Sequence, residues 1–150
     1  MSLKEELGII KNIPLFSKID PACLKLLAFA SDRLTFADGQ FFFHTGDQCD
    51  GAYVILEGEA EVLAGEADAL VAKLGPNDLI GEIAMICNKP RSASVRALGT
   101  VTVLRIPTDV FMPMLTEFPE MALEVAIELA HRLDRTTQKL VERNMESAKH

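Results

Sequence analysis

The stretch Gly81-Glu82-Ile83-Ala84, followed after five residues by Pro90-Arg91-Ser92-Ala93-Ser94-Val95, is the most informative part of this sequence. It sets one carboxylate, Glu82, and one guanidinium, Arg91, nine positions apart among apolar and small residues. Gly81 permits a tight backbone turn just before the carboxylate. An isolated pair of this kind is more often a pair of surface charges. The small and apolar neighbours instead favour a site for a ligand with a hydroxyl group at one end and a phosphate at the other.

A cyclic nucleotide presents both of these groups. Arginine offers a planar fork of donors that matches two phosphate oxygens, and Ser92 adds a hydroxyl beside Arg91. An ionised carboxylate accepts a ribose hydroxyl well, which suits Glu82. The small Ala84 and Ala93 leave room for a ligand to reach the main chain. These residue types therefore predict a phosphate clamp and a ribose clamp within one short segment.

The composition is typical of a single globular domain over residues 1–150. Of the 150 residues 49% are hydrophobic, which is enough for one core. No apolar run approaches the roughly 18 residues of a membrane span, and the N-terminus lacks the apolar segment of a signal peptide. The net charge is −7 without any basic run, which disfavours nucleic acid as a partner. Cys23, Cys49 and Cys87 fit neither paired disulfides nor a zinc site, so we expect reduced thiols in a cytoplasmic protein.

The chain divides into three zones. Residues 1–32 have a helical pattern, with Asp20 as N-cap and Pro21 at the first position of a second helix. In residues 33–107 short apolar runs alternate with glycines, as in an antiparallel sandwich or barrel. Residues 108–150 return to a helical pattern.

Glycine also punctuates the central zone. Glu57-Gly58-Glu59 separates the apolar runs at 52–56 and 60–63, and we expect it to form the tip of a hairpin.

The last helix is expected to run from about Pro119 to about Ser147, after a break at Phe118. Residues in this helix alternate spacings of three and four over three heptads: Leu123, Ala126, Ala130, Leu133, Thr137, Leu140 and Asn144. This pattern predicts a coiled-coil seam, and hence a homodimer through the helix at 121–147. The alternative is an amphipathic helix packed on its own barrel, because a period of 3.6 looks similar over this length.

The segments at 81–84 and 90–95 resemble the phosphate-binding cassette of the cyclic nucleotide-binding domain family, with the cassette at 81–95. The likeness extends over nearly the whole chain, including the helical lead and the segment at 46–59. It implies an α+β, mainly β fold, in which a double-stranded jelly-roll β-barrel lies between N-terminal helices and a long C-terminal helix.

The resemblance also assigns roles to single residues. It implies that Glu82 binds the ribose hydroxyl. It implies that Arg91 and Ser92 surround the phosphate together with the main chain of Ile83 and Ala84.

The purine base needs a wall and a lid. Val62, Val71 and Ile83 are candidates for the wall, and ordinary barrel core is an equally good interpretation of them. Residues 132–139 resemble the dimer helix of the cyclic-AMP receptor type of bacterial regulator, in which two successive hydroxyl residues, one from each subunit, reach the adenine. Thr136 and Thr137 occupy those places, although they also fit as a seam residue and a surface residue. We favour cAMP as the ligand, with cGMP as the alternative, and expect no other cofactor.

The sequence offers no catalytic set. Its three histidines are scattered, and the motifs of zinc proteases, α/β-hydrolases and P-loop enzymes are absent from it, so we expect neither an enzyme nor a metal site. The prediction is a sensor domain in which ligand binding moves the cassette and shifts the C-terminal helix about a hinge near Phe118-Pro119. The alternatives are the sensor part of a transcription regulator and the regulatory domain of a channel or kinase. The chain stops at His150, where such a regulator would continue into a helix-turn-helix, so we expect no direct contact with DNA. We also expect no membrane partner, because the sequence has no apolar run long enough to span a membrane.

Overall fold

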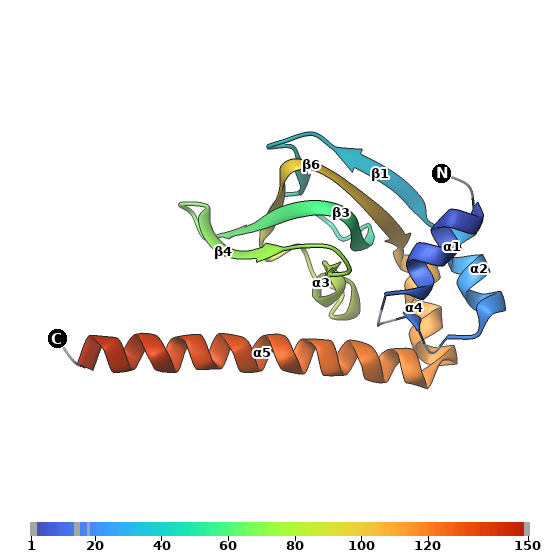
Figure 1. Ribbon diagram of the computed structural model, residues 1–150. Coiled ribbons are helices and arrows are strands. Elements are labelled where there is room, and N and C mark those ends of the chain that lie inside the picture. Colours follow the sequence, from blue (N-terminus) through green and yellow to red (C-terminus); the bar gives the residue numbers. More distant parts are fainter. Residues whose placement is uncertain (1–2, 14–15, 18, 149–150) are drawn as a thin grey trace.

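A computed structural model describes residues 3–13, 16–17 and 19–148. Helices α1 (Leu3–Lys11) and α2 (Pro21–Ala30) come first, as Figure 1 shows. The strands are β1 (Asp32–Phe36), β2 (Phe41–Phe43), β3 (Gly51–Ala64), β4 (Ala69–Leu74), β5 (Leu79–Ile80) and β6 (Ser94–Pro107). Helix α3 (Glu82–Ile86) lies between β5 and β6 in the chain, and α4 (Thr108–Glu117) and α5 (Pro119–Ala148) follow β6.

Helix α2 begins where the sequence predicts. The carboxylate of Asp20 accepts a hydrogen bond of 2.8 Å from the backbone N–H of Ala22, and Pro21 takes the first helical position. The side chain therefore satisfies one of the N–H groups that a helix leaves unpaired at its start.

The sheet is built on the two longest strands. β3 and β6 pair antiparallel from Gly51 opposite Pro107 to Leu63 opposite Ser94. β1 and β2 pair with β6, while β4 and β5 pair with β3. The predicted fold class is confirmed as a mainly antiparallel sheet with flanking helices and a long C-terminal helix, but the sheet is not closed into a barrel.

The expected hairpin tip at Glu57-Gly58-Glu59 is wrong, because these residues lie inside β3. Gly58 has a φ of 96°, and the register with β6 shifts between Ile55 and Glu57 and again between Glu57 and Glu59. A Cβ at this position would lie 2.6 Å from the carbonyl oxygen of Thr100. Gly58 therefore forms a bulge that lets one long strand continue, and not a turn between two strands.

Both faces of the first part of β3, residues 51–55, are buried. Ala52 and Val54 pack into the cluster shared with the helices, whereas Tyr53 and Ile55 pack into a second cluster on the other face. Alternate residues of a strand point to opposite faces, so burial of both produces the continuous apolar run seen in the sequence. β5 pairs with this part of β3, where Ile80 lies opposite Tyr53. The start of the cassette thus follows a strand that is fixed to the buried part of β3.

Helix α5 has two different faces. Met121 and Val125 are buried in the cluster shared with the other helices. The predicted seam residues are all exposed: Leu123, Ala126, Ala130, Leu133, Thr137, Leu140 and Asn144. In Figure 1 the helix runs along one side of the molecule, with α3 between it and the sheet, and continues past β4. None of the described helices has the length and apolarity required to cross a bilayer.

Candidate functional site

The cassette begins with a glycine that is required for two reasons. Gly81 precedes α3 with a φ of 82°, in the left-handed region that favours glycine. A Cβ at this position would lie 2.2 Å from Nη1 of Arg91. The turn and the close approach of the guanidinium both depend on the missing side chain.

Arg91 is only 3% exposed and is held on several sides. Its Nη1 donates to the carbonyl oxygen of Gly81 at 2.7 Å. Its Nη2 donates to the carbonyl oxygen of Gly51 at 2.7 Å and to Oδ1 of Asp50 at 3.1 Å. The guanidinium carbon lies 4.0 Å from the centre of the Phe43 ring. Nε is buried and has no hydrogen-bond partner among the described residues, so the group is fixed in place with a donor still available.

Glu82 is 1% exposed, which is unusual for a carboxylate. Its Oε1 accepts a hydrogen bond of 2.8 Å from Nη1 of Arg132, while its Oε2 has no partner within the described part of the chain. Burial raises the pKa of Glu82, and the positive charge of Arg132 acts in the opposite direction. Arg132 thus pairs with Oε1 of the Glu82 carboxylate, and Oε2 remains able to accept a hydrogen bond.

Sequence reasoning missed two charged partners of the site, Asp50 beside Arg91 and Arg132 beside Glu82. Arg132 belongs to the long helix. It projects from α5, donates to the carbonyl oxygen of Leu79 as well as to Glu82, and pairs with Glu128 on its own helix at 3.4 Å. Its position could have been inferred from spacing. The residues at 121, 125, 129 and 132 follow one helical stripe, and the first three are apolar and pack against the core. A cation that ends an inward-facing stripe predicts a buried acid opposite it.

The other predicted cassette residues occupy different environments. Ala84 is buried and Ala93 is half-buried, whereas Ile83 and Ser92 are exposed. Ile83 and Ala84 lie in the first turn of α3, where backbone N–H groups have no partner within the helix. The structure therefore gathers Gly81, the two charged groups and the start of α3 at one place.

The candidates for the wall and lid are more dispersed. Val62 is half-buried in β3 and packs on the second core cluster, and Val71 is exposed on β4. Thr136 and Thr137 are exposed, and their hydroxyls donate to the carbonyl oxygens four residues earlier in α5, both at 2.9 Å. Their proposed contacts with a base stay predictions.

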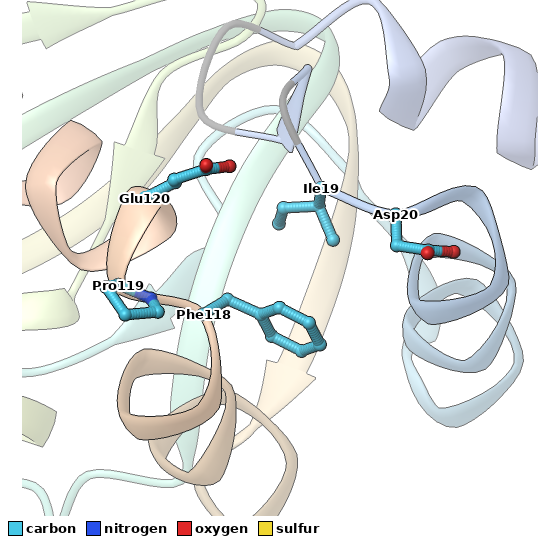
Figure 2. A pocket seen from close by; sticks show the side chains of 5 residues that line it. All are labelled: Ile19, Asp20, Phe118, Pro119 and Glu120. Atoms are coloured by element: carbon cyan, nitrogen blue, oxygen red, sulfur yellow. The ribbon is translucent and has the colours of Figure 1, made fainter.

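A cavity of about 450 Å³ lies elsewhere, between the segment before α2 and the junction of α4 and α5 (Figure 2). Ile19 and Phe118 supply apolar surface, and Asp20 and Glu120 place carboxylates at its sides. It borders the predicted hinge and contains none of the cassette residues. Within the described ranges, no cluster of three or more His, Cys, Asp or Glu side chains could hold a metal ion.

Comparison with known proteins identifies the arrangement. A sequence model described as the cyclic nucleotide-binding domain matches residues 33–118. The chain belongs to the cyclic nucleotide-binding domain family. The matched range contains the predicted cassette at 81–95, in which Glu82 and Arg91 are buried.

Relatives of this domain occur in several kinds of regulatory protein. The cAMP-dependent protein kinase regulatory subunit of Emericella nidulans is 33% identical over 108 residues, which cover 72% of this chain and 26% of that protein. The CRP-like cAMP-activated global transcriptional regulator of Mycobacterium tuberculosis is 24% identical over 137 residues, which cover 89% of this chain and 61% of that protein. The chain spans between 19% and 61% of the first curated relatives that it matches.

Among solved structures, the regulatory domain of Toxoplasma gondii PKA, crystallised with cAMP, has the same fold. Its TM-score is 0.76 with 22% identity, and the match covers 86% of this chain and 50% of that chain. The confirmed jelly-roll fold thus rests on both the sheet topology and this likeness.

Proposed function

We propose that this cyclic nucleotide-binding domain takes cAMP as its ligand. The observation that carries the proposal is the pair of buried charges beside Gly81, each with an unused polar atom. Oε2 of Glu82 is a free acceptor, and Nε of Arg91 is a free donor, within the part of the chain that the structure describes. A ligand with a ribose hydroxyl and an anionic cyclic phosphate satisfies both groups at once.

The roles follow from the chemistry of each group. Arg91, with the hydroxyl of Ser92 and the main chain of Ile83 and Ala84, holds the phosphate oxygens. Glu82 accepts the ribose 2′-hydroxyl through Oε2 while Oε1 keeps its contact with Arg132. Similarity to proteins named for cAMP supports adenine over guanine as the base of the ligand.

Titration calorimetry with cAMP and with cGMP tests the ligand. Arg91→Gln should weaken cAMP binding by roughly two to three decades or more, because an unpaired desolvated phosphate costs about 3–5 kcal/mol at about 1.4 kcal/mol per decade. Glu82→Gln should weaken binding less, since the amide still offers one acceptor. Arg96→Gln is the matched control, because Arg96 is a half-exposed arginine paired with Glu61 and should leave affinity unchanged. Failure of the unaltered chain to bind either nucleotide at millimolar concentration would refute the proposal.

We also propose that two copies associate through α5. The seam positions are exposed, while a different stripe of the same helix packs on the chain's own core. This division of faces favours the seam over the alternative of a helix packed by its heptad residues on its own sheet. In such a dimer Thr136 and Thr137, one from each copy, would approach the base, opposite a wall that includes Val62 and Val71.

The oligomeric state in solution tests this association. Leu140→Glu should shift the chain from dimer to monomer in sedimentation experiments. Val141→Glu is the control. Val141 is as exposed as Leu140 and follows it in the chain, but it is not one of the seam residues. A monomeric parent chain, or equal effects of both variants, would contradict the seam.

Ligand binding is proposed to act on α5 through Arg132. A ribose hydroxyl on Oε2 orders the carboxylate that Arg132 holds, so the bound state favours one position of the helix. An almost complete two-state shift needs about 5.5 kcal/mol of differential affinity. Hydrogen exchange around Arg132 should slow at saturating cAMP, and unchanged protection would refute the coupling.

The output of the domain is proposed to lie in a larger regulatory protein, a transcription regulator, a kinase subunit or a channel. The exposed seam of α5 favours the transcription regulator.

The free thiols of Cys23, Cys49 and Cys87 support a cytoplasmic location. Fractionation of cells that produce the tagged full-length protein tests the location.

A further inference from the structure

Arg105 occupies a central place in a row that crosses the sheet next to the cassette. On β6 it lies opposite Asp32 of β1 and opposite Tyr53 of β3. Its Nη2 donates to Oδ2 of Asp32 at 2.5 Å, and its Nη1 donates to Oδ2 of Asp50 at 3.3 Å. The same Nη1 lies 3.3 Å from the backbone carbonyl oxygen of Asp50, which it also contacts as a donor. Arg105 is therefore tied to one carboxylate on each side.

Asp50 is the carboxylate at which two arginines meet. Its Oδ1 accepts from Nη2 of Arg91 at 3.1 Å, and its Oδ2 accepts from Arg105. The hydroxyl of Tyr53 donates to the same carboxylate, at 3.1 Å from Oδ2 and 3.3 Å from Oδ1. Burial and the nearby Asp50 raise the pKa of Tyr53, so this hydroxyl stays protonated and remains a donor. Each oxygen of Asp50 is thus directed to a different cation.

This division decides which donors of Arg91 remain for a ligand. A guanidinium has five N–H donors, and Gly81, Gly51 and Asp50 take three of them. Nε–H and the second hydrogen on Nη1 remain. A carboxylate that is free to turn pairs with arginine through two parallel N–H groups. If Oδ2 of Asp50 were released, it could therefore take Nε–H as well.

We propose that Arg105 is a positioning residue for the phosphate site. With Asp32 it holds Oδ2 of Asp50 away from Arg91, so that Asp50 orients the guanidinium without occupying the donors that bind the phosphate. It also balances the negative charge of Asp50, which would otherwise repel an anionic ligand. The inference rests on the proposed role of Arg91 in phosphate binding, and Arg105 acts through Asp50 and not on the ligand itself.

The expected effect is moderate. The Arg105 and Asp50 side chains are 25% and 50% exposed, so solvent weakens their interaction. We expect Arg105→Gln to weaken cAMP binding roughly two- to fivefold.

A double-mutant cycle separates positioning from a purely structural role. Arg105→Gln should weaken cAMP binding in the parent chain and have no effect in an Asp50→Asn background, because the neutral amide does not compete for Arg91 as a carboxylate does. Arg105→Lys should restore much of the affinity, since it keeps the charge beside Asp50. Arg96→Gln, on the same strand and paired with Glu61, is the control and should change nothing. Equal losses in both backgrounds would overturn the proposal.

A second measurement needs no ligand. The NMR signal of the Arg91 Nε–H should move downfield in Arg105→Gln, as Asp50 takes this donor, and return in the double variant with Asp50→Asn. If the parent chain binds neither cAMP nor cGMP, the proposed function fails, and this signal still tests the arrangement. An Arg91 signal that is the same with and without Arg105 would overturn the inference.

Discussion

The contact between Glu82 and Arg132 leads to a quantitative prediction for Arg132→Met. Methionine keeps much of the apolar stem but leaves Oε1 of a carboxylate that is 1% exposed without its partner. Removing one member of a buried ion pair costs roughly 3–5 kcal/mol. Arg132 is 26% exposed, so water can partly replace it. The loss of stability also has an upper limit, because Glu82 can take up a proton instead of remaining an unpaired charge. At pH 7 this protonation costs about 3.7 kcal/mol, which is 1.36 kcal/mol for each pH unit above the ordinary carboxyl pKa of about 4.3.

We therefore expect the free energy of unfolding to fall by about 2–3 kcal/mol, which is roughly 4–12 °C in Tm for a chain of this size. In a Glu82→Gln background no buried charge remains to be neutralised, and Arg132→Met should cost less than about 1 kcal/mol. The coupling energy from urea denaturation of the four proteins should then be about 1.5–2.5 kcal/mol. Arg135→Met, at an exposed position on the same helix, should change stability by less than about 0.5 kcal/mol.

The pH dependence gives the same reasoning a second test. Protonated Glu82 needs no cation, so the effect of Arg132→Met should shrink as the pH is lowered toward the usual range of a carboxyl group. A coupling energy below about 0.5 kcal/mol at pH 7 would refute the assignment of Arg132 as the partner of Glu82.

Three further predictions concern the cassette. Gly81→Ala should weaken cAMP binding at least tenfold in calorimetry, because a Cβ there would lie 2.2 Å from Nη1 of Arg91; Gly65→Ala, with a similar φ and open space around it, controls for backbone strain. Burial raises the pKa of Glu82, so the native state holds this proton more tightly than the unfolded state, and its contribution to stability falls as the pH rises from the ordinary carboxyl range through the raised pKa. Urea denaturation at several pH values should show this slope in the parent chain and not in Glu82→Gln. Phe43→Leu should weaken cAMP binding roughly three- to tenfold, since it removes the ring 4.0 Å from the guanidinium of Arg91, and an unchanged affinity would mean that the ring serves only as packing.

The cassette could be predicted from sequence because its geometry is local. Gly81 must adopt a positive φ directly before Glu82, and Arg91 returns to the carbonyl oxygen of Gly81 across ten residues. Residue type, spacing and small neighbours carry all of this information. The fold class was equally accessible, because the alternation of apolar runs and glycines marks an antiparallel sheet.

The supports of the site could not be predicted in the same way. Arg132 reaches Glu82 from 50 residues further along the chain, and Asp50 reaches Arg91 from 41 residues earlier. The helical stripe at 121–132 indicates that Arg132 faces inward, but it does not identify the acid that Arg132 meets. That pairing, like the contact of Asp50 with Arg91, depends on how α5 and β3 are placed, and local pattern does not encode that placement. The prediction of a hairpin tip at Gly58 was wrong for a related reason. A glycine between two apolar runs fits a turn or a bulge equally well until the partner strand is known.

The two buried charges are neutralised from opposite sides of the site. Arg91 is paired with Asp50, which Arg105 connects to the sheet, whereas Glu82 is paired with Arg132 of α5. A ligand that bonds to both charges therefore joins the sheet to the long helix through two ion pairs that are already formed. Because each ion pair leaves one polar atom without a partner among the described residues, a ligand can add to these contacts and does not have to break them. Binding energy can then favour one position of α5, which is the property that a sensor domain with its output beyond the helix requires.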